Sequence, residues 1–557
     1  MVDQNVVDKI FIPGIDEGIW LAEPQNLQPW RRDAAEVDFV SICSDTPQRL
    51  NTYDNILSKE KWAKSVVFPT ALVVASHLSV AKATLSVGKK VVLNSTSGTR
   101  FRNKILQKDK ETEAAITERL RQVASENRLD IPVYPEDYRD LPLVIEAKNF
   151  FNFYHFVKES FPLLTLYKKH QLRGKIIIAG GGPISGFIQT LIAAWFPDLV
   201  DAVEINNDGG ALLFEKALFG LSTTHLYFQT TAKVIQEITD VGVNVPRKPS
   251  AANVISMSRN SIEQSLLEFR NHAAKITSDG KPARRRLYIT RKAERVRNVV
   301  GEELLIERLK KFGFEVASFE DYDQLGQAKL MWQTEAMVTL HGAGLTNMLF
   351  MQPGAHVIEL SNLQTLRKRY GDFTPLAIAA KVHYCHAFVD HDFDPPSEIP
   401  VISQHGLRGV RIDEFQADVL SSWIGKMVEP ERVKKAERDG ISQLSDDSAH
   451  LAEFILANRY LLSDNPEFHL MDFELQIAAG DKKAALVALE RAITLDPSNI
   501  QIQKSLLSLA AELKNEGAFQ AGSVHARRYG GSDIRSFYNS KGWTFKTSFA
   551  DAPGKRS

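Results

Sequence analysis

The sequence predicts an α/β protein with two Rossmann-like domains and a C-terminal, repeat-like α-helical region. Three observations support this fold class. Short apolar runs alternate with amphipathic segments over residues 284–360, a glycine-rich turn follows an apolar run within residues 175–186, and the pattern is helical from about residue 429 to 514. Alternating strands and helices are typical of a parallel sheet whose ligands bind beyond the carboxyl ends of its strands.

Length and composition limit the possible function classes. The 557 residues suffice for about three or four domain-sized units. The 68 basic and 68 acidic residues give no net charge, which argues against a general binder of nucleic acid or of anionic membranes. Cys43 and Cys385 are too few for a disulfide framework or a cysteine metal site. A signal-peptide pattern and a membrane-spanning apolar stretch are absent from the sequence, so a cytoplasmic location is expected.

The N-terminal domain is expected over residues 1–245, with a helix at residues 109–128. Residues 149–162 combine several aromatic side chains with His155 and Glu159, which are four residues apart and therefore share one face of a helix. From spacing alone, a buried histidine beside a surface glutamate is the better interpretation, because helix pairs at this spacing are common.

A rival function comes from the turn between Gly180 and Gly186, which follows a predicted strand, and from Glu204 after the next apolar run. This pattern looks like the first two motifs of an S-adenosylmethionine-dependent methyltransferase or an aminopropyltransferase. In those motifs the glycines allow close approach to the ligand and the acidic residue holds ribose hydroxyls. The same unit also suits a structural role, or the lining of an acceptor cleft, in a Rossmann-like domain.

The C-terminal domain is expected over residues 246–428, after a linker rich in Gly, Asn and Pro near residues 241–250 and a helix at residues 261–277. Its strands are predicted at 287–290, 314–319, 336–340 and 356–360, and its helices at 302–311, 324–333 and 345–351. The turn before the last of these helices contains glycines, so backbone N–H groups can approach a phosphate there.

Residues suited to a nucleotide ligand follow the predicted strand ends. Arg291 and Arg297 follow the first strand, and Glu359 lies near the C-terminal end of the last, where a carboxylate can accept both ribose hydroxyls. A capping role for Glu359 is equally open. The other candidates are His341, Gly342, Ala343, Gly344 and Asn347. Because the arginines can neutralise a diphosphate, neither a metal ion nor a cofactor is expected.

Several segments together resemble the donor-binding half of glycosyltransferase family 61. They are Leu287-Tyr-Ile-Thr-Arg291, Arg297, Glu302-Glu-Leu-Leu305, His341-Gly-Ala-Gly-Leu-Thr-Asn347, and Pro353-Gly with Val357-Ile-Glu-Leu360. The resemblance implies a GT-B fold and inverting, metal-independent transfer from a nucleotide sugar to a glycan, lipid-linked glycan or protein hydroxyl. A bacterial cytoplasmic enzyme of polysaccharide or glycoconjugate synthesis is expected, because relatives in the secretory pathway carry a signal or an anchor.

The resemblance extends to residues 149–162, which are similar to the family's aromatic-histidine signature. It favours Glu159 as the catalytic base, with His155 beside it to orient the carboxylate or contact the donor. One position departs from the family pattern, because Gly301 stands where asparagine is usual.

Residues 429–523 are expected to form a helical region that contains one tetratricopeptide-like repeat. Gly480, Ala485, Leu489, Ala492 and Pro497 have the spacing of small, large and proline positions around its second helix, with Leu489 as the large residue. One repeat is too short for a self-supporting stack, so this region is expected to dock on the catalytic domain or on a protein partner. A plain helical hairpin and a non-catalytic scaffold are the alternatives, and residues 524–557 are expected to be a loosely packed tail.

Overall fold

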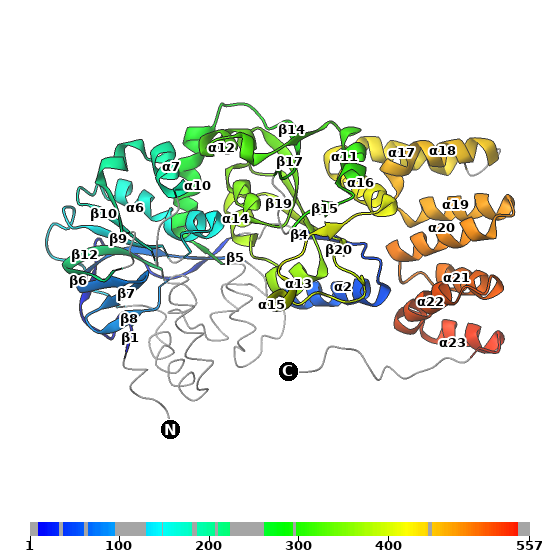
Figure 1. Cartoon of the computed structure of the whole chain (residues 1–557), viewed down its shortest axis with the longest axis horizontal. Coiled ribbons are helices and arrows are strands. Elements are labelled where there is room, and N and C mark those ends of the chain that lie inside the picture. The colour runs from blue at the N-terminus through cyan, green and yellow to red at the C-terminus, as the bar shows by residue number, and fades with distance from the viewer. Residues whose placement is uncertain are drawn as a thin grey trace, which may run out of the picture.

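The computed structural model describes residues 9–32, 37–60, 65–94, 130–147, 149–180, 186–206, 210–222, 261–292, 297–443 and 448–543. Within these ranges two large sheets lie side by side and a stack of helices follows at one end (Figure 1). The predicted helix at 109–128, the linker at 241–250 and residues 181–185 of the glycine turn lie outside the described residues. No helix within the described ranges is long and apolar enough to cross a membrane.

The first sheet is mixed, with nine strands among the described residues. Strands β9 (Leu143–Ala147), β10 (Ile176–Gly180) and β11 (Val203–Asn206) are parallel, as predicted for a Rossmann-like unit. The other strands are β1 (Ile10–Phe11), β2 (Ile19–Leu21), β6 (Thr70–Ala81), β7 (Thr84–Val87), β8 (Lys90–Val92) and β12 (Leu212–Ser222). Because β12, β6, β7 and β8 pair antiparallel, this sheet is mixed, whereas a Rossmann-like sheet is mostly parallel.

The second sheet is entirely parallel in its described strands, in the order β16-β14-β17-β18-β19-β4. The predicted alternation over residues 284–360 is confirmed. Its strands are β14 (Arg285–Ile289), β16 (Phe314–Ala317), β17 (Thr334–Leu340), β18 (His356–Ser361) and β19 (His383–Phe388). Its helices are α11 (Glu302–Lys310), α12 (Gln324–Trp332) and the 3-10 helix η4 (Ala343–Phe350). Strands β17 and β18 are apolar and buried, as expected inside a parallel sheet.

Strand β4 (Val37–Ser41) changes the predicted domain limits. It pairs parallel to β19, and α2 (Thr46–Glu60) follows it, so residues 37–60 join the second sheet rather than the N-terminal domain. The partners Val37 and Tyr384 are far apart along the chain. Hydrophobic periodicity reports only local structure, and it therefore cannot locate such a strand.

Helix α10 (Gln264–Thr277) joins the two halves. The ring of Phe269 lies 5.1 Å from that of Phe161 in the N-terminal half and 6.3 Å from that of Phe350 in η4. The predicted helix at 261–277 begins later than expected, because residues 261–263 form strand β13 (Ser261–Glu263), which pairs with β5 (Ser65–Phe68). Strand β3 (Trp30–Arg32) pairs with the other side of β5. One buried cluster thus spans both halves and holds the two sheets together.

Helices α17 to α23 form the stack at the end of the molecule (Figure 1). They are α17 (Pro430–Gln443), α18 (Ser448–Leu462), α19 (Pro466–Ala478), α20 (Lys482–Leu495), α21 (Ile500–Glu512), α22 (Glu516–Tyr529) and α23 (Gly531–Ser540). The predicted loose tail is wrong for residues 524–540, which lie in α22 and α23 and bury Ile534 and Tyr538. Residues 544–557 lie outside the described residues.

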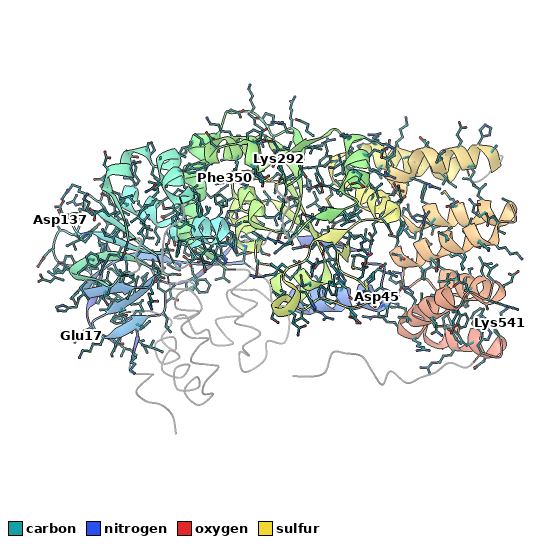
Figure 2. The ribbon with its side chains drawn as sticks, in the orientation of Figure 1. Glu17, Asp45, Asp137, Lys292, Phe350 and Lys541 are labelled. Atoms are coloured by element: carbon teal, nitrogen blue, oxygen red, sulfur yellow. The ribbon has the colours of Figure 1, made fainter. Side chains whose placement is uncertain are left out.

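The helical stack docks on the domain that contains the second sheet. Docking on the catalytic domain was one of the two predicted alternatives, and docking on a protein partner was the other. Arg528 Nη2 donates to the Leu50 carbonyl at 3.2 Å, and Arg49 Nη2 lies 3.4 Å from His525 Nε2. At the other end, Ser422 Oγ in α16 (Glu414–Val428) donates to the Leu461 carbonyl at 2.8 Å. Lys541 marks the far end of the stack in Figure 2.

Candidate functional site

A polar pocket of about 220 Å³ lies at the carboxyl ends of β14 and β17. Lys292, labelled in Figure 2, marks its position on the molecule. Ligands of open parallel sheets bind beyond this edge of the sheet. The polar and charged residues of the lining are Thr290, Arg291, Lys292, Arg297, Asn298 and Glu302.

Both predicted arginines converge on the turn that follows β17. Arg291 Nη2 donates to the His341 carbonyl at 3.1 Å, and Arg297 Nη1 donates to the same oxygen at 3.0 Å. A Cβ on Gly342 would lie 2.4 Å from Arg291 Nη2, so the guanidinium can approach only because this residue is glycine. The turn leads directly into the N-terminus of η4, where backbone N–H groups favour an anion.

Replacing Gly342 by alanine is expected to weaken the binding of a nucleoside diphosphate about tenfold, because the methyl group displaces Arg291. The melting temperature should change little, since the displaced atoms end a flexible side chain. Calorimetric titration with uridine and guanosine diphosphates measures the change. Gly186→Ala is the control, because a Cβ there meets nothing within 4 Å. If Gly342→Ala and Gly186→Ala bind the nucleoside diphosphates equally tightly, Gly342 is not needed to place Arg291 at the diphosphate.

Asn347 and Gly344 do not reach the pocket in the way the sequence predicted. Asn347 is 2% exposed, and its Nδ2 donates to Gln327 Oε1 at 3.1 Å. Gln327 in turn donates to the Phe319 carbonyl at 2.9 Å. A Cβ on Gly344 would touch the Phe319 ring at 3.4 Å. These two residues therefore pack η4 against its neighbours, and among the turn candidates the contacts with the arginines come from His341 and Gly342.

Glu359 is buried inside the second sheet with partners for both carboxylate oxygens. One oxygen lies 2.9 Å from His341 Nδ1 and accepts from Ser361 Oγ at 2.5 Å, and the other accepts from the Tyr384 hydroxyl. Burial raises the pKa of Glu359, but nearby His341 and His386 outweigh burial and lower it to about 2. A fully occupied, charged carboxylate suits a structural role in which Glu359 orients His341, whereas the structural role left open from the sequence was capping.

Glu359→Ala is expected to lower the free energy of unfolding by about 3–5 kcal/mol, because it removes the acceptor shared by buried partners. Glu359→Gln separates this role from ribose binding. With that variant, the ratio of affinities for uridine diphosphate and its 2′,3′-dideoxy analogue should equal the wild-type ratio. If only the wild type discriminates between these two nucleotides, Glu359 contacts the ribose.

His155 and Glu159 form a hydrogen-bonded pair in the N-terminal half. His155 ends α5 (Phe153–His155), and Glu159 lies in the π-helical turn η1 (Phe156–Ser160), a form frequent at functional sites. Glu159 Oε1 is 2.7 Å from His155 Nδ1, and the side chains are 15% and 27% exposed. The histidine is therefore partly exposed, and it is not the enclosed core residue that spacing alone favoured.

Aromatic rings connect this pair to the turn in the second sheet. The ring of Tyr154 lies 5.0 Å from that of His155 and 4.7 Å from that of Phe373. Phe373 in turn lies 5.4 Å from the ring of His341. The Tyr154 hydroxyl also donates to the Asp372 carbonyl, which fixes the two halves to each other. A chain of ring contacts thus links His155 in the N-terminal half to His341 in the second sheet.

The sequence interpretation missed Glu263, a half-buried residue at the end of β13. Burial and the negative charge of Glu159 raise the pKa of Glu263 to about 7, although Lys158 and a hydrogen bond with Ser222 oppose them. A carboxyl group that titrates near neutral pH beside a candidate base is a candidate for proton transfer. No local signal identified it, because its strand forms only by pairing with β5.

The rival nucleotide motif lacks its acidic residue at the required edge of the first sheet. Glu204 pairs in register with Ile177, near the start of β10, and its carboxylate lies 3.2 Å from Lys175 Nζ. A ribose-binding carboxylate has to follow the carboxyl end of its strand. The placement of Glu204 therefore gives no support to a methyltransferase site.

Gly301, the departure from the family pattern, has a local physical reason. Its φ is +79°, and a Cβ would lie 2.1 Å from the Ile412 carbonyl oxygen. The amide of Ile412 donates to the Val300 carbonyl at 2.9 Å, which holds that backbone in place. A side chain at residue 301 would therefore require the adjacent backbone to move.

Comparisons with known proteins relate this chain to glycosyltransferases. Residues 153–358 match the family model Glycosyltransferase 61. The chain is also 22% identical over 232 residues to the beta-1,2-xylosyltransferase XYXT1 of Oryza sativa subsp. japonica. That alignment covers 40% of this chain and 46% of the rice protein, so the chain spans about half the length of this relative. The family match includes the His155–Glu159 pair, both arginines and the turn after His341.

Proposed function

Because residues 153–358 form a Glycosyltransferase 61 match, we propose that the protein transfers a sugar from a nucleotide-sugar donor to the hydroxyl group of a glycan, lipid-linked glycan or protein. The observation that carries the proposal is the convergence of Arg291 and Arg297 on the His341 carbonyl, beside a pocket at the strand ends. Two guanidinium groups at a helix N-terminus suit the charge and geometry of a diphosphate.

The proposed transfer inverts the configuration of the donor sugar. Glu159 takes the proton of the acceptor hydroxyl while that oxygen attacks the anomeric carbon. The bond to the nucleoside diphosphate breaks on the opposite face, and Arg291 and Arg297 stabilise the charge that develops on the leaving diphosphate. His155 holds Glu159 in place through the 2.7 Å contact.

Transfer is expected to persist in excess EDTA, because the arginines supply the positive charge that a metal ion provides in other transferases. The assay follows nucleotide release from a panel of nucleotide sugars with neutral oligosaccharide acceptors. The panel includes uridine diphosphate xylose, since the rice relative is named as a xylosyltransferase. Complete loss of activity in EDTA that manganese or magnesium restores would contradict the metal-independent mechanism. Absence of transfer under all conditions would contradict the function itself.

The proposal includes a GT-B arrangement, in which the acceptor lies against the N-terminal half and the donor against the second sheet. It also places the enzyme in a bacterial cytoplasm, in surface polysaccharide or glycoconjugate synthesis. Cys43 and Cys385 are free and buried, as suits a reducing compartment. The hairpin of α19 and α20 supports a tetratricopeptide-like unit, whose exposed face would take a protein partner.

A further inference from the structure

A second polar pocket, of about 270 Å³, lies in the N-terminal half at the start of α10. One wall comes from the segment between β2 and β3, and the other comes from the end of α6 (Leu163–Lys169) and the start of α10. The two helices pack side by side (Figure 1). Its lining residues differ from those of the pocket beside Arg291.

The lining combines one exposed indole ring with many hydrogen-bonding groups. Trp30 is 42% exposed, which is unusual for a large aromatic side chain. Among the described lining side chains only that of Pro24 lacks a polar atom, and the residues with side-chain amides are Gln25, Asn26, Gln28 and Gln264. Amide groups offer both donors and acceptors, and an indole ring offers a broad apolar face.

Contacts within the wall hold these polar groups in position. Tyr138 donates to Glu23 Oε1 at 2.6 Å, and Gln25 Nε2 donates to Gln264 Oε1 at 3.3 Å. Lys169 Nζ donates to Glu268 Oε1 at 2.8 Å, which offsets its charge. The pocket is therefore preformed and carries little net charge, as a neutral polar ligand requires.

We infer that this second pocket binds a neutral oligosaccharide, and that it is a subsite for the acceptor glycan of the proposed transferase. A sugar ring presents an apolar C–H face that stacks on an aromatic ring, and its hydroxyls pair with amide and carboxylate groups. Apart from Pro24, the described side chains that line the pocket are polar, charged or aromatic, so it offers little to a lipid or to the apolar side chains of a peptide. The acidic Glu23 disfavours an anionic ligand.

The position of the pocket suits an acceptor that also reaches Glu159. A helical run connects Glu159 to Lys169 through η1 and α6, a path of about 15 Å. Glu263, which interacts electrostatically with Glu159, directly precedes Gln264 of the pocket wall. A short oligosaccharide spans such a distance, with its reacting end at Glu159 and a more distant sugar ring on Trp30.

The test measures the binding of xylohexaose, cellohexaose, mannohexaose and chitohexaose to the full chain, without any donor, by calorimetry and saturation-transfer NMR. At least one hexaose should bind. Trp30→Ala should weaken that binding about tenfold or more, and Trp30→Phe should weaken it less. Gln28→Ala is a second loss variant that leaves β3 intact, and Tyr322→Ala is the control, because that ring is 38% exposed on the second domain.

Two outcomes overturn the inference: none of the four hexaoses binds, or Trp30→Ala and Gln28→Ala bind them as tightly as Tyr322→Ala does.

The acceptor role rests on the proposed function and has its own readout. Trp30→Ala should raise the KM for a hexaose acceptor at unchanged kcat, with the KM for a single-sugar glycoside unaffected. If hexaoses bind through Trp30 but no nucleotide sugar binds, the subsite stands and the transferase function fails. If transfer to a hexaose acceptor occurs but does not depend on Trp30, the transferase function stands and the acceptor subsite fails.

Discussion

Glu159→Gln is expected to slow sugar transfer by about 10²-fold or more while the affinity for the donor stays unchanged, since general-base catalysis contributes about 10²–10⁴-fold. The amide is nearly isosteric with the carboxylate but cannot take the proton of the acceptor hydroxyl. Nucleotide release gives kcat, and calorimetry with the nucleoside diphosphate gives the donor affinity.

Two neighbouring variants show whether Glu159 itself is the base. His155→Ala should reduce both rate and donor affinity, because His155 orients the carboxylate through a 2.7 Å contact and lies two rings from His341. Glu263→Gln should leave a substantial rate but alter the pH profile near pH 7, where its carboxyl group titrates. If Glu159→Gln keeps near-normal turnover while either of the other two changes abolishes it, the base is His155 or Glu263.

Arg297→Ala is expected to weaken nucleoside diphosphate binding by about 1.5–3 kcal/mol, the usual contribution of hydrogen bonds to charged groups, which is roughly 10- to 150-fold in Kd. Arg297→Lys should recover only part of the loss, because lysine keeps the charge but not the planar guanidinium. Calorimetry measures the affinity, and thermal unfolding checks that the fold persists.

Arg285→Ala is the matched control for that change. Arg285 begins β14, the strand before Arg297 in the chain, but it faces Glu315 on the surface, and its Nη2 donates to Glu315 Oε2 at 2.6 Å. Its loss should leave the diphosphate affinity at the wild-type value. Similar losses in Arg285→Ala and Arg297→Ala would mean that general positive charge, rather than the pocket, attracts the nucleotide.

The sequence predicted the second sheet well because its elements are marked locally. The runs that became β14, β17 and β18 are short and apolar, and Gly313 and Gly342 stand at the boundaries between elements. By contrast, β4 and β13 are strands only because distant segments pair with them. Propensity and periodicity contain no information about such partners, which is why the first domain limit and the start of α10 were misplaced.

The positions of candidate site residues were predictable where side chains project from a strand end or share a helix face. Arg291 and Arg297 line the predicted pocket, and His155 and Glu159 pair as their spacing indicated. Asn347 follows the same glycine turn, yet it faces Gln327, because a 3-10 helix begins there. The direction of a side chain depends on the type of helix, and the sequence pattern did not distinguish a 3-10 helix from an α-helix.

The most direct test of the central claim is calorimetric titration of the wild-type chain with nucleotide sugars, nucleoside diphosphates and S-adenosylmethionine. We expect one nucleotide sugar to bind, its nucleoside diphosphate to compete with it, and Arg297→Ala to weaken both, with no heat from S-adenosylmethionine. Binding of S-adenosylmethionine without binding of any nucleotide sugar would contradict the proposed transferase function. It would favour the alternative function, a methyltransferase or aminopropyltransferase that uses the glycine turn at residues 180–186.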